Sequence, residues 1–200
     1  MYTLICGSPK FKNSNSDYFL KIISSKLQEY DYYSLKNIKY DSILESIYKN
    51  DVIVFAFPLY VDSPTSITLS FLDYVIDNNI NLKRKLVYVV INCGFREGKQ
   101  NITAVNIMKR WCDKVGAVYA SSIMIGAGEI VGKDKFNFIS RNALKKINNF
   151  ANIIKMKVIN DDIITTIDLL NNRLYCFLAN LSWNKKGKKN NLSFADLKTK

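Results

Sequence analysis

The segment Asp51–Phe57 (Asp-Val-Ile-Val-Phe-Ala-Phe) constrains the fold of this chain more than any other stretch. It is apolar from Val52 onward, it is rich in β-branched residues, and Pro58 follows it. A strand without polar alternation is typical of a parallel sheet that is covered on both faces by helices. The segment therefore predicts a layered α/β domain.

Further strands alternate with amphipathic helices along the chain. The expected strands cover residues 1–6, 31–36, 51–57, 86–91 and 117–125. The expected helices cover residues 15–30, a short stretch that begins with a Ser42–Glu45 capping box, a stretch that begins with Ser63 as N-cap before Pro64, residues 104–115 closed by Gly116, and residues 134–158. This alternation predicts a parallel sheet with right-handed crossovers.

The strand count favours a three-layer, doubly wound α/β fold with a five-stranded parallel sheet in the order 2-1-3-4-5. In that order the first and third strands are neighbours at the point where the winding direction reverses. The loops that begin at Gly7 and Pro58 then meet at one edge of the sheet. Open α/β sheets bind their ligands at this switch point, so we expect a ligand between these two loops.

The C-terminal part reads differently from the rest. We expect residues 1–160 to form the ligand-binding domain and residues 161–200 to form a helical extension. Apolar residues recur there with heptad spacing at Ile163, Ile167, Leu170, Leu174, Phe177 and Leu181. The run is too short for a coiled coil, so the helix either packs on its own domain or serves as an arm at a dimer interface. A basic turn over 184–191 and a short helix around 194–197 are expected after it.

Composition limits the chemistry. The chain has no histidine, which removes histidine acid/base catalysis, Ser-His-Asp triads and HExxH zinc sites. The four cysteines lie far apart in the sequence and predict reduced thiols, with no disulfide framework and no metal site. If the protein is an enzyme, a cofactor is expected to carry the difficult step.

Charge and hydropathy give expectations about partners. The formal net charge of +12 fits either a solvated basic surface or a nucleic-acid-binding patch, and the spread of the charges along the chain favours the first. We expect no nucleic-acid partner. No apolar run is long enough for a membrane span, and the first one lacks the features of a signal peptide, so a cytoplasmic location is expected.

The loop Gly7–Ser16 follows a strand and leads into a helix, where unpaired backbone N–H groups favour an anion. It lacks the glycines and the Gly-Lys-Ser/Thr ending of nucleoside-triphosphate and dinucleotide motifs. The loop is therefore either an ordinary turn capped by Ser14 or Asn15, or a cradle for the monophosphate of a cofactor. Its hydroxyls, amides and lysines favour the cradle.

Two further loops share that edge. Leu59, Tyr60 and Val61 follow a central strand, where apolar side chains form a wall for a flat ring. The loop Asn92–Glu97 follows the next strand, and Gly94 permits close backbone approach to a ligand. Together the three loops predict a mononucleotide with a large planar base. Gly126–Gly132 has GxGxxG-like spacing with one additional residue but follows the last strand, so we interpret it as a loop near the ligand.

These motifs, namely Gly-Ser-Pro-Lys with Ser14-Asn15-Ser16, Pro58-Leu-Tyr-Val-Asp, and Asn92-Cys-Gly-Phe with Glu97, resemble the flavodoxin-like NADPH-dependent FMN reductase family. More narrowly, the chain is similar to its bacterial NAD(P)H-dependent oxidoreductase group over nearly its whole length. The resemblance implies an oxidoreductase that passes hydride from NADPH or NADH through bound FMN to a small acceptor such as a quinone, a nitroaromatic or a flavin. It also implies a homodimer.

The resemblance implies which residues bind FMN. The phosphate would be surrounded by Ser8, Lys10, Ser14, Asn15 and Ser16. The ring would be lined by Pro58, Leu59, Tyr60, Val61, Asn92, Cys93, Gly94, Phe95 and Glu97. The family often has arginine at the position of Lys10 and proline at the position of Arg96, so the phosphate contact and the rim of the pocket differ here.

Two alternatives remain open from the sequence. A flavodoxin-type electron carrier would have the same fold without turnover of its own, although this chain lacks the Thr-Gly-Asn-Thr-like loop and the acidic surface typical of such carriers. A module of the same fold that lacks flavin and binds nucleic acid would use the positive charge instead.

Overall fold

The structure is a computed structural model that describes residues 1–10, 13–36, 38–132, 137–167, 172–192 and 196. The chain divides into two compact units, Met1–Ile167 and Asp168–Lys200. The first unit contains the complete sheet. The fold and the site described below are therefore properties of residues 1–167.

The first unit alternates strands and helices, as the hydrophobic pattern predicts. The strands are β1 (Tyr2–Cys6), β2 (Tyr30–Ser34), β3 (Val52–Pro58), β4 (Leu86–Asn92), β5 (Val118–Ile125) and β6 (Ile163–Thr165). The helices are α1 (Asn15–Ser24), α2 (Tyr40–Lys49), α3 (Ser66–Asp77), the 3-10 turn η1 (Gly98–Asn101), α4 (Ile102–Val115), α5 (Gly128–Val131) and α6 (Asn137–Lys155). The second unit contributes α7 (Asn172–Lys189).

All strands of the sheet run parallel, in the order β2-β1-β3-β4-β5-β6. The predicted order 2-1-3-4-5 is confirmed, and β6 extends the sheet beyond β5. The helix expected from residue 161 onward is wrong over β6, where Ile163–Thr165 pair with Ile123–Ile125. Strand pairing with an existing edge overrides the heptad spacing there, because periodicity alone does not determine which surface is available.

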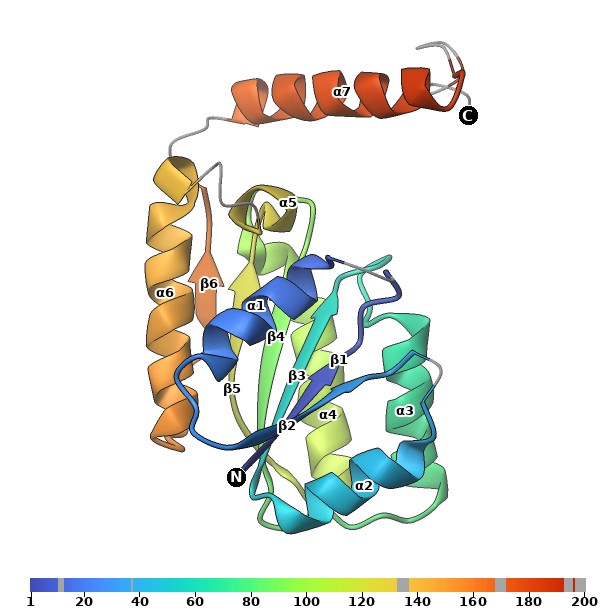
Figure 1. The fold of residues 1–200 in the computed structure, drawn as a ribbon, viewed down its shortest axis with the longest axis vertical. Coiled ribbons are helices and arrows are strands. Elements are labelled where there is room, and N and C mark those ends of the chain that lie inside the picture. The colour runs from blue at the N-terminus through green and yellow to red at the C-terminus, as the bar shows by residue number, and fades with distance from the viewer. Residues whose placement is uncertain (11–12, 37, 133–136, 168–171, 193–195, 197–200) are drawn as a thin grey trace. The chain divides into compact units, whose positions relative to one another are not determined.

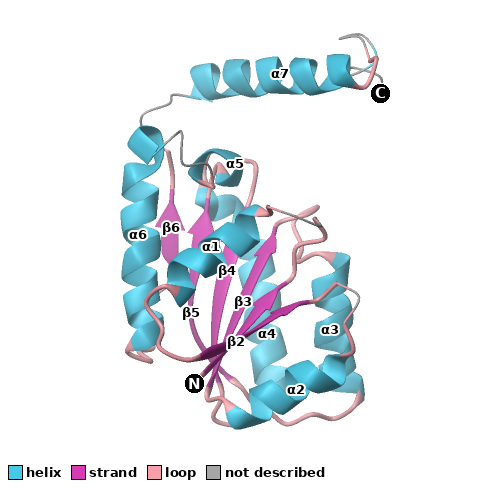
Figure 2. Cartoon of the chain, in the orientation of Figure 1, coloured by secondary structure: helices cyan, strands magenta, loops and turns pink. Residues whose placement is uncertain are grey.

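Helices cover both faces of the sheet (Figure 1, Figure 2). One layer contains α2, α3 and α4, whose apolar residues form one buried cluster with alternate residues of the strands, including Phe55, Phe57 and Ile91. The intervening strand residues face the opposite side, where α1 and α6 pack against each other and Tyr88 contacts Phe150. Residues 52–57 are buried on both sides, as predicted.

Several helix ends differ from the predictions. The first helix ends at Ser24 and not near residue 30, because Ser24 and Ser25 donate their hydroxyls to carbonyls of the preceding turn and the chain turns away. The predicted Ser42–Glu45 capping box is wrong. Ser42 already lies in the first turn of α2, and its hydroxyl donates to the carbonyl of Lys39. The left-handed Gly116 closes α4 as predicted, with φ of 74°.

The start of α3 also differs. The predicted N-cap Ser63 is wrong, since the helix begins at Ser66 with Thr65 as its N-cap residue. Ser63 instead closes a tight turn with Tyr60. The Thr65 hydroxyl does not cap the helix but donates to the Gly7 carbonyl at 2.6 Å. A tertiary contact thus uses the hydroxyl of the N-cap residue, and α3 begins without a side-chain cap.

Other predictions concern the chain after β5. Helix α6 ends at Lys155 and not at residue 158, because Lys157 adopts a left-handed conformation with φ of 55°. The basic turn expected over 184–191 is wrong for its first part, since α7 continues to Lys189. Residues 134–136, Leu170 and most of the expected helix at 194–197 lie outside the described residues.

Asp162 anchors the additional strand β6. Its carboxylate accepts hydrogen bonds from Lys109, Tyr119 and both the backbone N–H and the hydroxyl of Ser122, with the Lys109 Nζ at 2.7 Å. Burial raises the pKa of Asp162, but these four donors outweigh burial and hold the pKa below its usual range.

Asp162→Asn should destabilise the first unit by about 2 kcal/mol, because it removes the charge that holds Lys109 and Tyr119. Since the folded pKa of Asp162 is lowered, its contribution is fully present above the unfolded pKa of about 3.9 and is lost as the pH falls through the folded value. Denaturant unfolding at pH 7 and at pH 3 measures this. The neighbouring Asp161→Asn is the control, and an equal loss in both variants at pH 7 would contradict the assignment.

Candidate functional site

Three loops meet at the carboxyl edge of the sheet, after β1, β3 and β4. Strand β1 pairs with β2 on one side and with β3 on the other, so the strand order reverses between β1 and β3. The switch point therefore lies where predicted. The backbone N–H of Gly7 donates to the carbonyl of Ala56 at 2.8 Å, and Leu59 N–H donates to the carbonyl of Asn92 at 2.8 Å. These bonds hold the three loops at one edge.

The loop after β1 begins with a glycine for a steric reason. A Cβ on Gly7 would lie 2.0 Å from the Thr68 hydroxyl oxygen. Only glycine therefore allows this loop to pack directly on α3. Beyond it, Ser8 is 4% exposed and accepts a hydrogen bond from the Lys10 N–H at 3.4 Å. The Lys10 ammonium folds back onto the carbonyl of Asn13 at 3.2 Å.

The start of α1 is capped by Ser14. Its hydroxyl accepts from the Asp17 N–H at 3.1 Å, so of the two residues that the ordinary-turn alternative named as caps, Ser14 has that role. The first N–H groups of the helix, those of Asn15 and Ser16, have no intrahelical acceptor by helix geometry. They leave donors and a partial positive charge at the loop, where an anion is favoured.

The Ser16 side chain points toward Asn92 at the end of β4. It is 1% exposed, and its hydroxyl accepts a hydrogen bond from the Asn92 side-chain amide at 2.9 Å. The same amide lies 3.3 Å from the Phe57 carbonyl, which it also donates to. Asn92, itself 4% exposed, therefore cross-links the start of α1 and the ends of β3 and β4.

The loop after β3 forms a tight turn. Tyr60 and Ser63 exchange two backbone hydrogen bonds of 3.0 Å, and the residues between them are left-handed, with φ of 49° at Val61 and 56° at Asp62. Left-handed backbone is strained for a β-branched residue. The Val61 side chain is 99% exposed and Tyr60 is 52% exposed. A strained turn therefore presents two apolar side chains at the edge of the site.

The loop after β4 contains both buried and open positions. Phe95 is 56% exposed, and a Cβ on Gly94 would meet no atom within 4 Å. Cys93 is buried, and its thiol accepts from the Asn101 amide at 3.5 Å. Burial raises the pKa of Cys93, so its thiol is protonated at neutral pH.

Glu97 lies in a group of charges. Its carboxylate contacts Arg96 and Lys99, each at 3.2 Å, and the ion pair with Lys99 holds the pKa of Glu97 below its usual range. Its backbone forms a bridge with Thr166, and the Arg96 guanidinium donates to the Ile167 carbonyl at 3.4 Å. The end of this loop is thus fastened to the chain that follows β6.

Sequence reasoning missed the contacts that join the loops. Thr65, which bonds Gly7, and the amide of Asn92, which bonds Ser16, are connected over 58 and 76 residues of chain. No local pattern reveals such pairs. The sequence did single out Gly126–Gly132, and the spacing of its glycines was the available signal that another segment approaches closely there.

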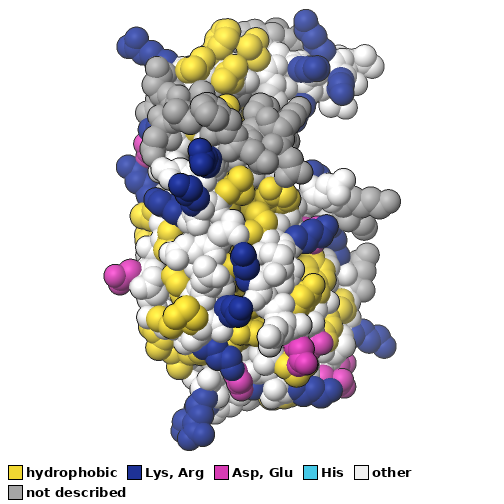
Figure 3. All heavy atoms as spheres, turned by 60° about the vertical axis from the view of Figure 1, so that its left-hand side comes forward, with side chains coloured by type: hydrophobic (Ala, Val, Ile, Leu, Met, Phe, Trp, Pro, Cys, Tyr) yellow, Lys and Arg dark blue, Asp and Glu magenta, His cyan; other side chains and the backbone are white. Residues whose placement is uncertain are grey.

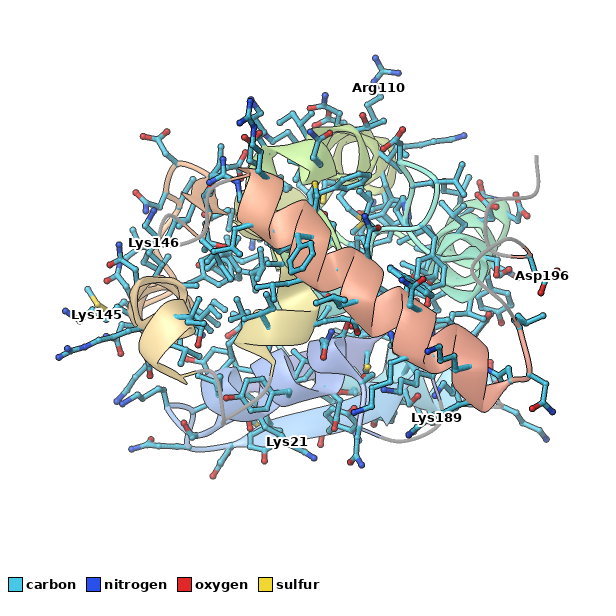
Figure 4. The ribbon with its side chains drawn as sticks, turned by 90° about the horizontal axis from the view of Figure 1, so that it is seen from above. Lys21, Arg110, Lys145, Lys146, Lys189 and Asp196 are labelled. Carbon is cyan, nitrogen blue, oxygen red and sulfur yellow. The ribbon has the colours of Figure 1, made fainter. Side chains whose placement is uncertain are left out.

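The basic side chains are spread over the surface. On the face in Figure 3 they are scattered among apolar and neutral groups. In Figure 4, Lys21 on α1, Arg110 on α4 and Lys145 on α6 lie at separate places around the periphery. Within the described parts of the chain, no group of three or more acidic or cysteine side chains could hold a metal ion. No helix among those residues is long and apolar enough to cross a membrane.

The sequence matches no protein-family model and no curated protein. Solved structures do match. An NADPH-quinone reductase from P. pentosaceus aligns with a TM-score of 0.61 at 15% identity, over 79% of this chain and 99% of that one. The Trp repressor binding protein from Bacillus subtilis aligns with a TM-score of 0.59 at 17% identity, over 74% of this chain and 96% of the other. A flavodoxin from Streptococcus pneumoniae TIGR4 aligns with a TM-score of 0.58 at 16% identity, over 79% and 100%.

These three structures are covered almost in full, whereas about a fifth or more of this chain has no counterpart in them. At such identities the likeness establishes the fold, and it agrees with the resemblance drawn from the sequence. The chain has a flavodoxin-like fold.

Proposed function

We propose that the protein is an FMN-dependent NAD(P)H oxidoreductase that reduces a small acceptor such as a quinone, a nitroaromatic or a flavin. The observation that carries this proposal is the meeting, at the switch point of the sheet, of a helix N-terminus and a strained turn with exposed apolar side chains. An anion site beside an apolar wall fits a mononucleotide that has a phosphate at one end and a flat ring at the other.

The phosphate would lie at the start of α1. The Asn15 and Ser16 backbone N–H groups, the Ser8 and Ser14 hydroxyls and the Lys10 ammonium supply donors there. Among the described residues the Lys10 ammonium donates only to the Asn13 carbonyl, which a phosphate would replace at low cost. Ser16 would contribute mainly its backbone N–H, because its hydroxyl already accepts a hydrogen bond from the Asn92 side-chain amide.

The ring would lie against the two loops after β3 and β4. The residues proposed for this contact are Pro58, Leu59, Tyr60, Val61, Asn92, Cys93, Gly94, Phe95 and Glu97. Tyr60, Val61 and Phe95 supply exposed apolar surface that a ring would cover and shield from water. Gly94 leaves the backbone open to close approach.

When bound, FMN supplies a ring that accepts hydride from a reduced nicotinamide and returns two electrons to an acceptor. The chain's own residues bind the phosphate, orient the ring and exclude water from one of its faces. No histidine is needed for this work, in keeping with a sequence that has none. NAD(P)H and one proton from water together supply the two hydrogens that a quinone gains.

The similarity to an NADPH-quinone reductase and to a flavodoxin supports this proposal and its main alternative equally. The alternative is an electron carrier that binds FMN but does not oxidise NAD(P)H. We also propose that the protein is cytoplasmic and that it forms a homodimer, as the resemblance to the reductase family implies.

We predict that the purified chain binds FMN and then oxidises NADPH or NADH in the presence of a quinone. Lys10→Ala should weaken FMN binding about tenfold, because it removes a charged phosphate donor. Lys26→Ala, beyond the end of α1, should not change it. Flavin fluorescence measures binding and nicotinamide absorbance measures turnover.

The outcomes of this experiment separate the candidates. FMN binding without turnover would favour the electron carrier. If the purified protein is colourless, does not bind FMN and binds DNA or RNA in a salt-sensitive way, this result would favour the nucleic-acid-binding module and overturn the proposal.

Val61→Asn tests the strained turn. Asparagine tolerates left-handed backbone, so the substitution should stabilise the fold by about 1 kcal/mol. It also removes an apolar wall residue, so FMN affinity should fall several-fold. Asp62→Asn is the matched control in the same turn, with affinity unchanged. A Val61→Asn variant that gains stability and keeps full affinity would remove Val61 from the ring contact.

Thiol titration tests whether cysteine chemistry contributes. Cys6, Cys93 and Cys112 are buried and Cys176 is exposed, and burial raises the pKa of Cys112 to about 12. A thiol reagent should therefore label one cysteine per native chain rapidly, and none in Cys176→Ser. Cys93→Ala should retain turnover at saturating FMN, even if FMN binds more weakly, because a thiol that only lines the ring takes no part in the reaction. Rapid labelling of Cys93, or loss of turnover in Cys93→Ala with FMN still bound, would make that thiol part of the reaction.

A further inference from the structure

We propose that the glycine-rich segment Gly126–Gly132 is a positioning element that sets the geometry of the proposed FMN site. This inference rests on the proposed function. The segment includes α5, which Figure 1 shows at the carboxyl end of β5. None of its residues belongs to the loops proposed to touch FMN. Its glycines resemble a phosphate-binding pattern, but the structure gives each of the three another role.

Gly126 packs on the loop after β4. A Cβ there would lie 2.2 Å from the Arg96 carbonyl oxygen and 2.7 Å from the Gly98 nitrogen. The next two residues donate their backbone N–H groups to that loop, Ala127 to the Phe95 carbonyl at 2.5 Å and Gly128 to the Cys93 carbonyl at 2.9 Å. The loop proposed to line the ring therefore rests directly on this backbone.

Gly128 packs on Asn92. A Cβ there would lie 2.9 Å from the Asn92 Oδ1 and 3.1 Å from its Cβ. Contact closer than ordinary van der Waals distance would force the Asn92 side chain to move. Because the Asn92 amide bonds Ser16 and the Phe57 carbonyl, any shift would reach the start of α1 and the end of β3.

Gly132 packs on the first residue of α1. A Cβ there would lie 2.6 Å from the Asn15 Oδ1 and 3.0 Å from the Gly128 carbonyl oxygen. Asn15 belongs to the proposed phosphate site. The three glycines thus contact, in order, the loop after β4, the cross-linking Asn92 and the helix start.

Ala127 indicates that the turn is held in place. It is a fully buried, non-glycine residue in the left-handed region, with φ of 51°. Such a conformation persists only where surrounding contacts determine it. A generic loop after β5 would not need this combination of a strained alanine and close-packed glycines.

The test compares Gly128→Ala and Gly132→Ala with Gly116→Ala in the full chain. Gly116 is the control because it closes α4 at the opposite edge of the sheet, and alanine there is disfavoured by the left-handed φ of 74° and not by contact with the proposed site. All three substitutions add one methyl group and should lower the melting temperature. Only Gly128→Ala and Gly132→Ala should weaken FMN binding, by about tenfold, because small displacements of a binding group are costly.

A second readout is independent of FMN. Hydrogen exchange of the free protein should speed up at residues 92–97 and 13–18 in Gly128→Ala and Gly132→Ala, and not in Gly116→Ala. Faster exchange in these loops of a chain that binds no FMN would leave the positioning role standing and remove the proposed function. Unchanged exchange, or equal loss of FMN affinity in Gly116→Ala, would overturn the positioning role.

Gly132→Ala keeps the test decisive if Gly128→Ala does not fold, because its methyl group meets chiefly the end of a side chain. Adding Asn15→Ala to Gly132→Ala removes the nearest clashing atom. Exchange in residues 92–97 and 13–18 should then return toward the wild-type rate. A double variant that exchanges as fast as Gly132→Ala would contradict the proposed contact.

Discussion

The burial of both faces of a parallel sheet is the constraint on which the rest of this structure depends. The side chains of residues 52–57 are buried on both faces of the sheet, so helices must cover each face. Because the strands are parallel, each must be connected to the next by a crossover. The loops at the carboxyl edge link each strand to the next helix and are not part of those covered faces. The proposed site lies where two of those crossovers diverge, between β1 and β3.

The loops at this edge are joined by side chains more than by their own sequences. Thr65 bonds Gly7, and Asn92 bonds both Ser16 and the Phe57 carbonyl. Each pair satisfies a buried polar group that would otherwise be costly. The same bonds fix the distance between the helix start and the ring-side loops. The groups that stabilise this edge are therefore also the groups that would shape a ligand site.

Left-handed residues and close-packed glycines occur together at the same edge. Val61, Asp62 and Ala127 adopt left-handed conformations there, and Gly7, Gly126 and Gly128 leave no space for a side chain. Such positions are destabilising unless the surrounding structure holds them. The amino edge, by contrast, uses a glycine at Gly116 in the ordinary way, to end a helix.

The sequence by itself determined the α/β class, the strand order 2-1-3-4-5 and the three loops that share an edge, because apolar runs and helical periodicity are local signals. It also indicated Gly116 as the end of α4, and it left Ser14 and Asn15 as alternative caps of α1. Only the tertiary structure decided that Ile163–Thr165 join the sheet. It also decided that the Thr65 hydroxyl donates to the Gly7 carbonyl and that the Ser16 hydroxyl accepts from the Asn92 amide. These outcomes depend on which groups meet across many residues of chain, and local propensity carries no information about that.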